Sequence, residues 1–86
     1  MNNFQGLRAQ LEKQDWPSVY FFKFILPNEN EKIAQLSALF ENSELKLQPS
    51  RNGKFISISS KEVMLNAEKV IEIYEKASLI KGIISL

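Results

Sequence analysis

The chain has 86 residues and a formal net charge of +1, with 44% hydrophobic and 24% charged residues. These values fit one small globular domain and exclude a disordered chain or two independent cores. The chain has no cysteine and no histidine. It therefore has no disulfide or thiolate chemistry, and it lacks the commonest general base and metal ligand.

The first residues, MNNFQGLRAQLEKQDW, lack a basic region followed by an apolar run. No apolar stretch approaches the ~18 residues of a transmembrane helix. A net charge close to zero predicts no general attraction to nucleic acid or to an anionic membrane. We therefore expect a cytoplasmic protein that does not contact a membrane. We expect a single domain over residues 1–86, made of an N-terminal helical extension (1–15) and a core (16–86).

The first two elements differ in the period of their apolar residues. Phe4, Leu7 and Leu11 have helical spacing, which predicts a short helix within residues 3–14. The next stretch, SVYFFKFIL, is rich in aromatic and β-branched residues and predicts a strand between Pro17 and Pro27. Alternation gives this strand one face with Tyr20, Phe22, Phe24 and Leu26, and a second face with Val19, Phe21, Lys23 and Ile25.

The run NENEKIAQLSALFEN predicts an amphipathic helix of about three turns. Asn28 and Asn30 are the candidate N-cap residues, because their side-chain oxygens can accept hydrogen bonds from free backbone N–H groups. Ile33, Leu36 and Phe40 fall on one stripe. This stripe is expected to cover an apolar surface.

The segment ELKLQPSRNGKFISISSKEV alternates on both sides of Asn52-Gly53 and predicts a β-hairpin. This dipeptide tolerates the positive φ angles of a type I′ turn, which we expect here. Leu45 and Leu47 share one face of the first strand. On the second strand the expected inward residues are Ile56 and Ile58, and the expected outward residues are Phe55, Ser57 and Ser59.

Asn66 is expected to cap a second amphipathic helix, AEKVIEIYEKAS. The expected buried stripe of this helix is Val70, Ile73, Tyr74 and Ala77. The closing segment, GIISL, predicts a short strand. We expect Ile84 and Leu86 to point inward on this strand, and Ile83 and Ser85 to point outward.

After the N-terminal helix the predicted order is strand, helix, strand, strand, helix, strand. Right-handed crossovers place both of these helices on the same face of one sheet. The sequence therefore predicts an α+β fold: a ferredoxin-like βαββαβ sandwich with a four-stranded antiparallel sheet and two helices on one face, plus the short N-terminal helix. The first strand is expected to be central. We call the sheet face opposite the helices the open face.

Three segments, WPSVYFFKFILP, PSRNGKFISIS and VIEIYEKASLIKGIISL, span about residues 16–86 together with the helix between them. In this order and spacing the chain resembles the YbeD-like family of conserved bacterial proteins of unknown function. The resemblance implies a ferredoxin-like fold, a small soluble bacterial protein and a likeness to small-molecule-binding regulatory domains of the ACT type. It supplies no catalytic residues.

Motifs that suggest chemistry have simpler explanations. Glu68, Glu72 and Glu75 have helical spacing, but lysines lie among them, so a solvated helix face is favoured over a metal site. The segment SRNGK has one glycine and is followed by a predicted strand, unlike a phosphate-binding loop. The serines have no imidazole to activate them. We therefore expect no enzyme activity and no catalytic, metal-binding or cofactor-binding residues.

The open face supplies the candidate interaction residues: Phe21, Lys23, Ile25, Lys46, Phe55 and Ser57, with Lys61 in phase with them. We expect a non-enzymatic binding or regulatory module whose partner is an unknown protein or a small-molecule effector. Single-stranded nucleic acid is the alternative, because RNA-recognition domains stack bases on aromatic residues of this face. The segment NGKFISIS, however, lacks their glycine and aromatic spacing. Burial of the open face by a homodimer or by the N-terminal helix also stays open.

Overall fold

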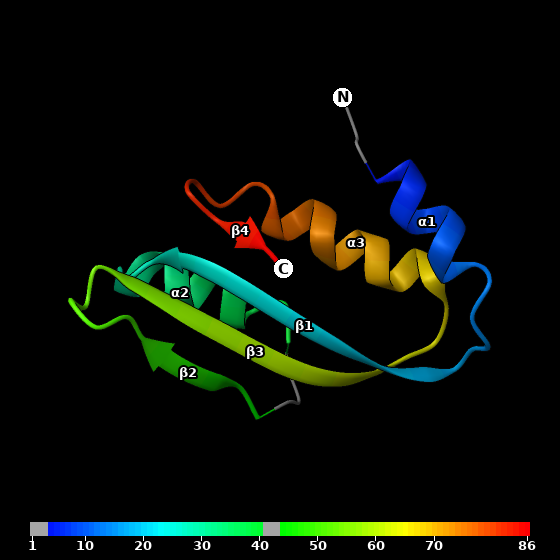
Figure 1. Cartoon of the computed structure of the whole chain (residues 1–86), viewed down its shortest axis with the longest axis horizontal. Coiled ribbons are helices and arrows are strands. Elements are labelled where there is room, and N and C mark those ends of the chain that lie inside the picture. Colours follow the sequence, from blue (N-terminus) through cyan, green and yellow to red (C-terminus); the bar gives the residue numbers. More distant parts are fainter. Residues whose placement is uncertain (1–3, 41–43) are drawn as a thin grey trace.

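The computed structural model describes residues 4–40 and 44–86 (Figure 1). Within these ranges the elements are α1 (Gln5–Leu11), β1 (Ser18–Pro27), α2 (Asn30–Ser37), β2 (Lys46–Pro49), β3 (Phe55–Met64), α3 (Ala67–Ala77) and β4 (Ile84–Ser85). The strands form one antiparallel sheet in the order β2-β3-β1-β4. The predicted α+β class and four-stranded antiparallel sheet are confirmed, and β1 is central as expected. No helix in the described ranges is long and apolar enough to span a membrane.

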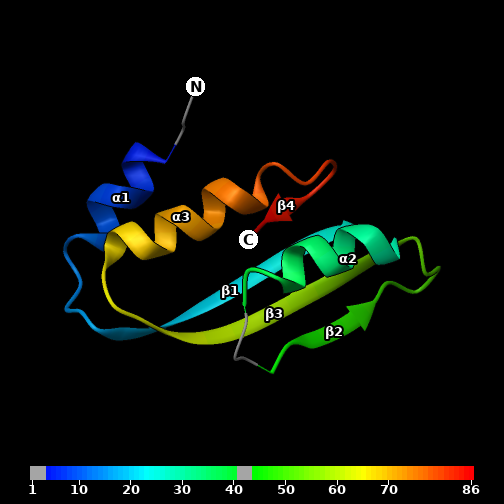
Figure 2. The same cartoon turned by 180° about the vertical axis from the view of Figure 1, so that it is seen from behind.

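The sheet has two long central strands and two short outer strands. β1 and β3 pair along their whole length, from Ser18 opposite Met64 to Pro27 opposite Phe55. β2 pairs with β3 over four residues, and β4 pairs with β1 over two. Figure 1 and Figure 2 show α2 and α3 on the same side of this sheet. The long β1–β3 ribbon is therefore the platform on which both helices pack.

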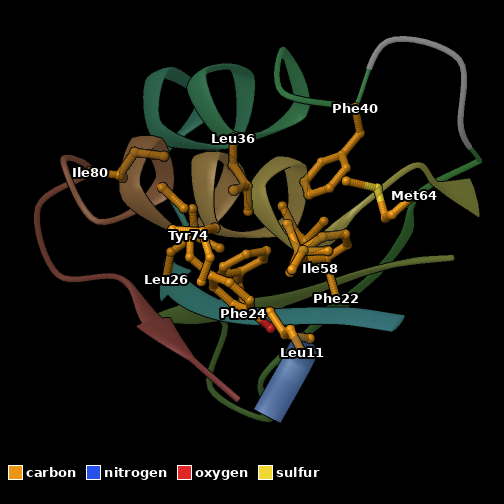
Figure 3. Packing of buried hydrophobic residues seen from close by; sticks show 14 of the residues in the cluster. Leu11, Phe22, Phe24, Leu26, Leu36, Phe40, Ile58, Met64, Tyr74 and Ile80 are labelled. Atoms are coloured by element: carbon orange, nitrogen blue, oxygen red, sulfur yellow. The ribbon is translucent and has the colours of Figure 1, made fainter. Parts of the chain in front are cut away.

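The core lies between the helices and the alternate residues of β1 and β3 that face them. Phe22, Phe24 and Leu26 are fully buried, as the alternation of β1 predicts. The Phe22 ring lies 4.7 Å from Tyr20, 5.3 Å from Phe40 and 5.4 Å from Tyr74, measured between ring centroids. Figure 3 shows the side chains of this core converging; it labels Leu11, Phe22, Phe24, Leu26, Leu36, Phe40, Ile58, Met64, Tyr74 and Ile80.

The two core helices follow the expected pattern with differences at the ends. The side chain of Asn66 caps α3 by accepting a hydrogen bond from Lys69 N–H at 2.9 Å. The expected residue Ile73 is only half-buried, whereas Ile71 is fully buried. The helix α2 has eight residues rather than three full turns. Its N-cap is Glu29, without a side-chain cap, so the predicted caps Asn28 and Asn30 are wrong.

The β2–β3 hairpin is present, but its turn is not type I′. That turn requires positive φ at both central residues, and in this hairpin only Gly53 has one, at 76°. Gly53 N–H donates to the Ser50 carbonyl at 2.9 Å, and Ser50 N–H donates to the Phe55 carbonyl at 2.8 Å. The side-chain oxygen of Asn52 accepts from Lys54 N–H at 3.0 Å. The loop is therefore longer than two residues, and Asn52 stabilises it through its side chain.

The predicted inward and outward faces of the last strand are wrong. Ile84 pairs with Ile25, and Leu86 N–H donates to the Lys23 carbonyl at 2.9 Å. This register places Ile84 and Leu86 on the open face, where both are exposed. Ile83 is half-buried and packs against the core instead.

The N-terminal helix α1 packs against α3. The Phe4 ring stacks on Tyr74 at 6.0 Å between centroids, Leu11 is buried in the core, and Arg8 forms an ion pair with Glu68. The indole N–H of Trp16 donates to the Leu11 carbonyl at 2.9 Å. Of the alternatives left open by the sequence, burial of the open face by this helix is therefore not what the structure shows. The helix extends the helical layer.

Candidate binding face

The open face displays large apolar side chains without a covering layer. Phe21 is 69% exposed, Val63 71% and Ile84 55%. The six residues expected there (Phe21, Lys23, Ile25, Lys46, Phe55 and Ser57) all point to this face, because their pairing register puts them out of phase with the buried residues. The grouping of large exposed apolar side chains on one sheet face makes this face the candidate interaction surface.

The register divides the open face into two apolar ends and a polar middle. At one end Val19 lies opposite Val63, and Phe21 lies opposite Lys61. In the middle, Ser59 of β3 lies between its two pairing partners, Lys23 and Lys46. The other end is formed by Ile25, Ile84, Ser57 and Gln48, with Phe55 opposite Pro27.

The two exposed aromatic rings lie far apart. Phe21 pairs with Lys61, and Phe55 pairs with Pro27, so the two register positions are six residues apart along β1. At about 3.3 Å per residue this separation is roughly 20 Å. Both rings lie on the open face, as expected, but at different places along the strands. They cannot form one stacking platform for adjacent bases.

Two shallow hollows on the sheet surface share Lys23. A hollow of about 310 Å³ is lined by Lys23, Ile25, Gln48, Pro49, Ser50, Phe55, Ile56 and Ser57. A larger one of about 430 Å³ is lined by Phe21, Phe22, Lys23, Glu44, Lys46, Ser59, Ser60 and Lys61. Each of the six expected residues lines at least one of them. Glu44 and Gln48 were missed, because the place of β2 beside β3 depends on the pairing register and not on local sequence.

The charged residues that line the larger hollow are mostly positive. Lys23, Lys46 and Lys61 all line the larger hollow, and the only carboxylate among its described lining residues is Glu44. The ammonium group of Lys61 lies 5.6 Å from the centre of the Phe21 ring, a cation–π contact. The ion pairs between described residues all lie elsewhere: Arg8–Glu68, Glu29–Lys32 and Lys69–Glu72. The open-face lysines therefore have no carboxylate partner in the described ranges.

The structure brings together no metal-ligating cluster within its described residues. Glu68 pairs with Arg8, and Glu72 pairs with Lys69 at 3.6 Å. These contacts favour the interpretation of the α3 glutamates as a solvated helix face. Ser50 takes part in the hairpin turn, where its hydroxyl accepts from Phe55 N–H at 3.1 Å.

The most perturbed titratable group lies in the core rather than on the open face. Burial raises the pKa of Tyr74 above its ordinary value, and the hydrogen bond with Tyr20 adds to this effect. The two hydroxyl oxygens are 3.0 Å apart. Because Tyr74 points from α3 into the core and Tyr20 lies on the helix-covered side of β1, neither faces a ligand on the open face, and we assign this pair to the packing of the core.

Comparison with known proteins adds no assignment. No protein-family model matches the chain, and neither a curated protein nor a solved structure does. The resemblance to YbeD-like proteins therefore stays a prediction that rests on the three sequence segments.

Proposed function

We propose that the protein is a non-enzymatic, cytoplasmic regulatory module that binds a small-molecule effector on the open face of its sheet. The observation that carries this proposal is the pair of hollows on a face that no described helix covers. Their volumes of about 310 and 430 Å³ lie at the lower end of the range for small-molecule sites. They combine exposed apolar walls with a few polar groups, which is the usual composition of such sites.

The proposal includes a ferredoxin-like fold of the YbeD-like type. The order β1-α2-β2-β3-α3-β4 and the strand order β2-β3-β1-β4 support a βαββαβ sandwich. The likeness of the YbeD-like family to ACT-type regulatory domains favours a small effector over a macromolecular substrate.

A binding screen that locates the ligand tests the proposal. Backbone amide signals would be followed by NMR while amino acids, organic acids, sugars and nucleosides are added in turn. A ligand is expected to shift amides such as those of Ile25, Ser57 and Ser59, because they lie in the two hollows. Shifts restricted to α1 and α3, or no shift with any compound, would refute the proposal.

A double variant tests whether the ligand binds to the open face. Phe21→Ser with Phe55→Ser is expected to stay folded, because both side chains are exposed, and to lose ligand binding. Leu79→Ser is the matched control, since Leu79 is 84% exposed and lines neither hollow. Equal ligand response in the wild type and in the double variant would contradict a site on the open face.

An oligonucleotide titration and a sedimentation measurement separate the two other partners. A single-stranded oligonucleotide that bound would favour nucleic acid. In that case Lys23→Glu would lower the slope of log affinity against log salt by about 0.7 for the lost phosphate contact. Sedimentation that showed a dimer dissociated by the double serine variant would favour a second copy of this chain.

A further inference from the structure

The pairing register places three lysines around one serine on the open face. Lys23 and Lys46 lie on either side of Ser59, on β1 and β2, because both pair with it. Lys61 lies two residues further along β3, on the same face. Directly paired residues are about 5 Å apart, and diagonal neighbours about 7–8 Å. The three cationic side chains therefore start from positions within about 10 Å of one another.

Such an arrangement has an electrostatic cost that the described residues do not offset. Like charges at neighbouring positions of a sheet repel one another. The hollow that these lysines line contains three lysines and one described carboxylate, Glu44. A bound anion would remove the repulsion and gain attraction from three ammonium groups at once.

Protection of a sheet edge against pairing with another chain does not account for the positions of all three lysines. Lysines are common on edge strands, where they prevent pairing with another chain. Only Lys46 lies on an edge strand, because β2 is outermost, whereas Lys23 and Lys61 lie on the central strands β1 and β3. The cluster is therefore centred on the middle of the sheet, in the larger hollow.

The walls of this hollow favour an anion that also has an apolar part. The Phe21 ring is 69% exposed and lines the hollow beside Lys61. Ser59 adds a hydroxyl that can donate a hydrogen bond to an oxyanion. β2 pairs with β3 only as far as Lys46 opposite Ser59, so from Ser60 onward the edge of β3 that faces away from β1 has no described strand partner. This edge is next to Lys61, whose ammonium group lies over the Phe21 ring on the neighbouring strand β1.

We propose that the larger hollow is a site for a small organic dianion, with the phosphate or dicarboxylate group held by Lys23, Lys46 and Lys61 around Ser59 and an apolar group against Phe21. This inference rests on the proposed function, since it names the ligand class of the same face. It adds that charge, rather than apolar contact alone, selects the ligand.

Four probes test the charge and the apolar part separately: phenyl phosphate, inorganic phosphate, benzoate and the neutral benzyl alcohol. Affinities would be measured by NMR titration at low salt in a buffer without polyvalent anions. Phenyl phosphate is expected to bind most tightly, because it combines two charges with a ring. Inorganic phosphate and benzoate are expected to bind more weakly, and benzyl alcohol weakest.

Charge-removing variants locate the site. Lys46→Gln is expected to weaken phenyl phosphate binding at least about fivefold, the effect of losing one pair of unit charges about 4 Å apart in water. Lys76→Gln is the matched control, because it removes the same charge from an exposed position of α3 and is expected to leave the affinity unchanged. If both variants weakened binding equally, attraction by the overall charge would replace a defined site.

The melting temperature, measured with and without ligand, distinguishes a ligand-binding lysine from one that only stabilises the fold. Without ligand at low salt, Lys46→Gln is expected to melt at or above the wild-type temperature, because one repulsive charge is gone. It is also expected to lose most of the rise that phenyl phosphate gives the wild type. A variant that melted lower and kept the full rise would overturn the anion site.

The outcomes distinguish the two proposals. If neutral compounds shift open-face amides and the anions do not, the anion site is wrong and the proposed function stands. If neither class shifts them, both are wrong. If a single-stranded oligonucleotide binds and phenyl phosphate does not, the lysines serve a nucleic-acid backbone, and the small-anion proposal is overturned.

Discussion

The strongest test of the fold is a comparison of two neighbouring phenylalanines on β1. Phe22 is 1% exposed and Phe21 is 69% exposed, so the same substitution probes opposite faces of the sheet. Phe22→Ala removes a ring that packs against Tyr20, Phe40 and Tyr74. It is expected to cost about 3–5 kcal/mol. At ~0.05–0.15 kcal/mol per residue, a domain of this length has about 4–13 kcal/mol in total, so this loss is roughly a quarter of the total stability or more.

Phe21→Ala is expected to cost at most about 1.5 kcal/mol, since only about a third of its ring area of roughly 200 Å² is removed from water. Urea unfolding followed by fluorescence gives both values, because Trp16 is the single tryptophan and its half-buried indole is held by the Leu11 carbonyl. If the two variants lost the same stability, the open face would be covered in solution, and the argument for a binding surface there would fail.

Three further perturbations test local features. Gly53→Val is expected to lower the free energy of unfolding, measured with urea, by about 1–3 kcal/mol. The cause is backbone strain alone, because φ is +76° and nothing lies within 4 Å of an added Cβ. The control Gly6→Ala, in α1, should be neutral or stabilising. Asn66→Ala is expected to cost about 1 kcal/mol through loss of the α3 cap, and unchanged stability would contradict the role of its bond to Lys69 N–H. Because the folded pKa of Tyr74 is raised, the contribution of this tyrosine to stability is expected to stay constant below about pH 10 and to fall above it by up to about 1.4 kcal/mol per pH unit. In Tyr20→Phe, where Tyr74 is the only tyrosine, tyrosinate absorbance should still appear at higher pH in the folded than in the unfolded protein, since burial is the largest cause of the shift.

The sequence predicted those parts of the fold in which local pattern and tertiary packing agree. The two faces of β1 follow from alternation alone, because ten residues in one strand fix which side chains are buried. The cap at Asn66 follows from residue type and from the apolar period that comes after it. These features need no knowledge of the rest of the chain.

The errors occurred where a distant pairing partner or a side-chain hydrogen bond, rather than the local pattern, sets the structure. β4 has two residues, too few for alternation to assign a face, and its pairing of Ile84 with Ile25 decides the matter. At the hairpin, the side chain of Asn52 bonds to Lys54 N–H, which allows a longer loop than the Asn-Gly pair predicted. α2 ends at Ser37, yet Phe40 is buried because the chain after the helix still lies over Phe22.

The candidate site shows the same division between local and long-range information. Alternation placed Phe21, Lys23 and Phe55 on one face, but only the register shows that Phe21 and Phe55 lie at its opposite ends and that Lys23 lies beside Ser59. A base that stacked on one ring could not reach the other without spanning roughly 20 Å of sheet. A small ligand needs no such span, because Phe21 and the three lysines line a single hollow. The register that weakens the case for nucleic acid thus supports the proposed compact anionic ligand, whose charge Lys23 on this apolar strand would help to neutralise.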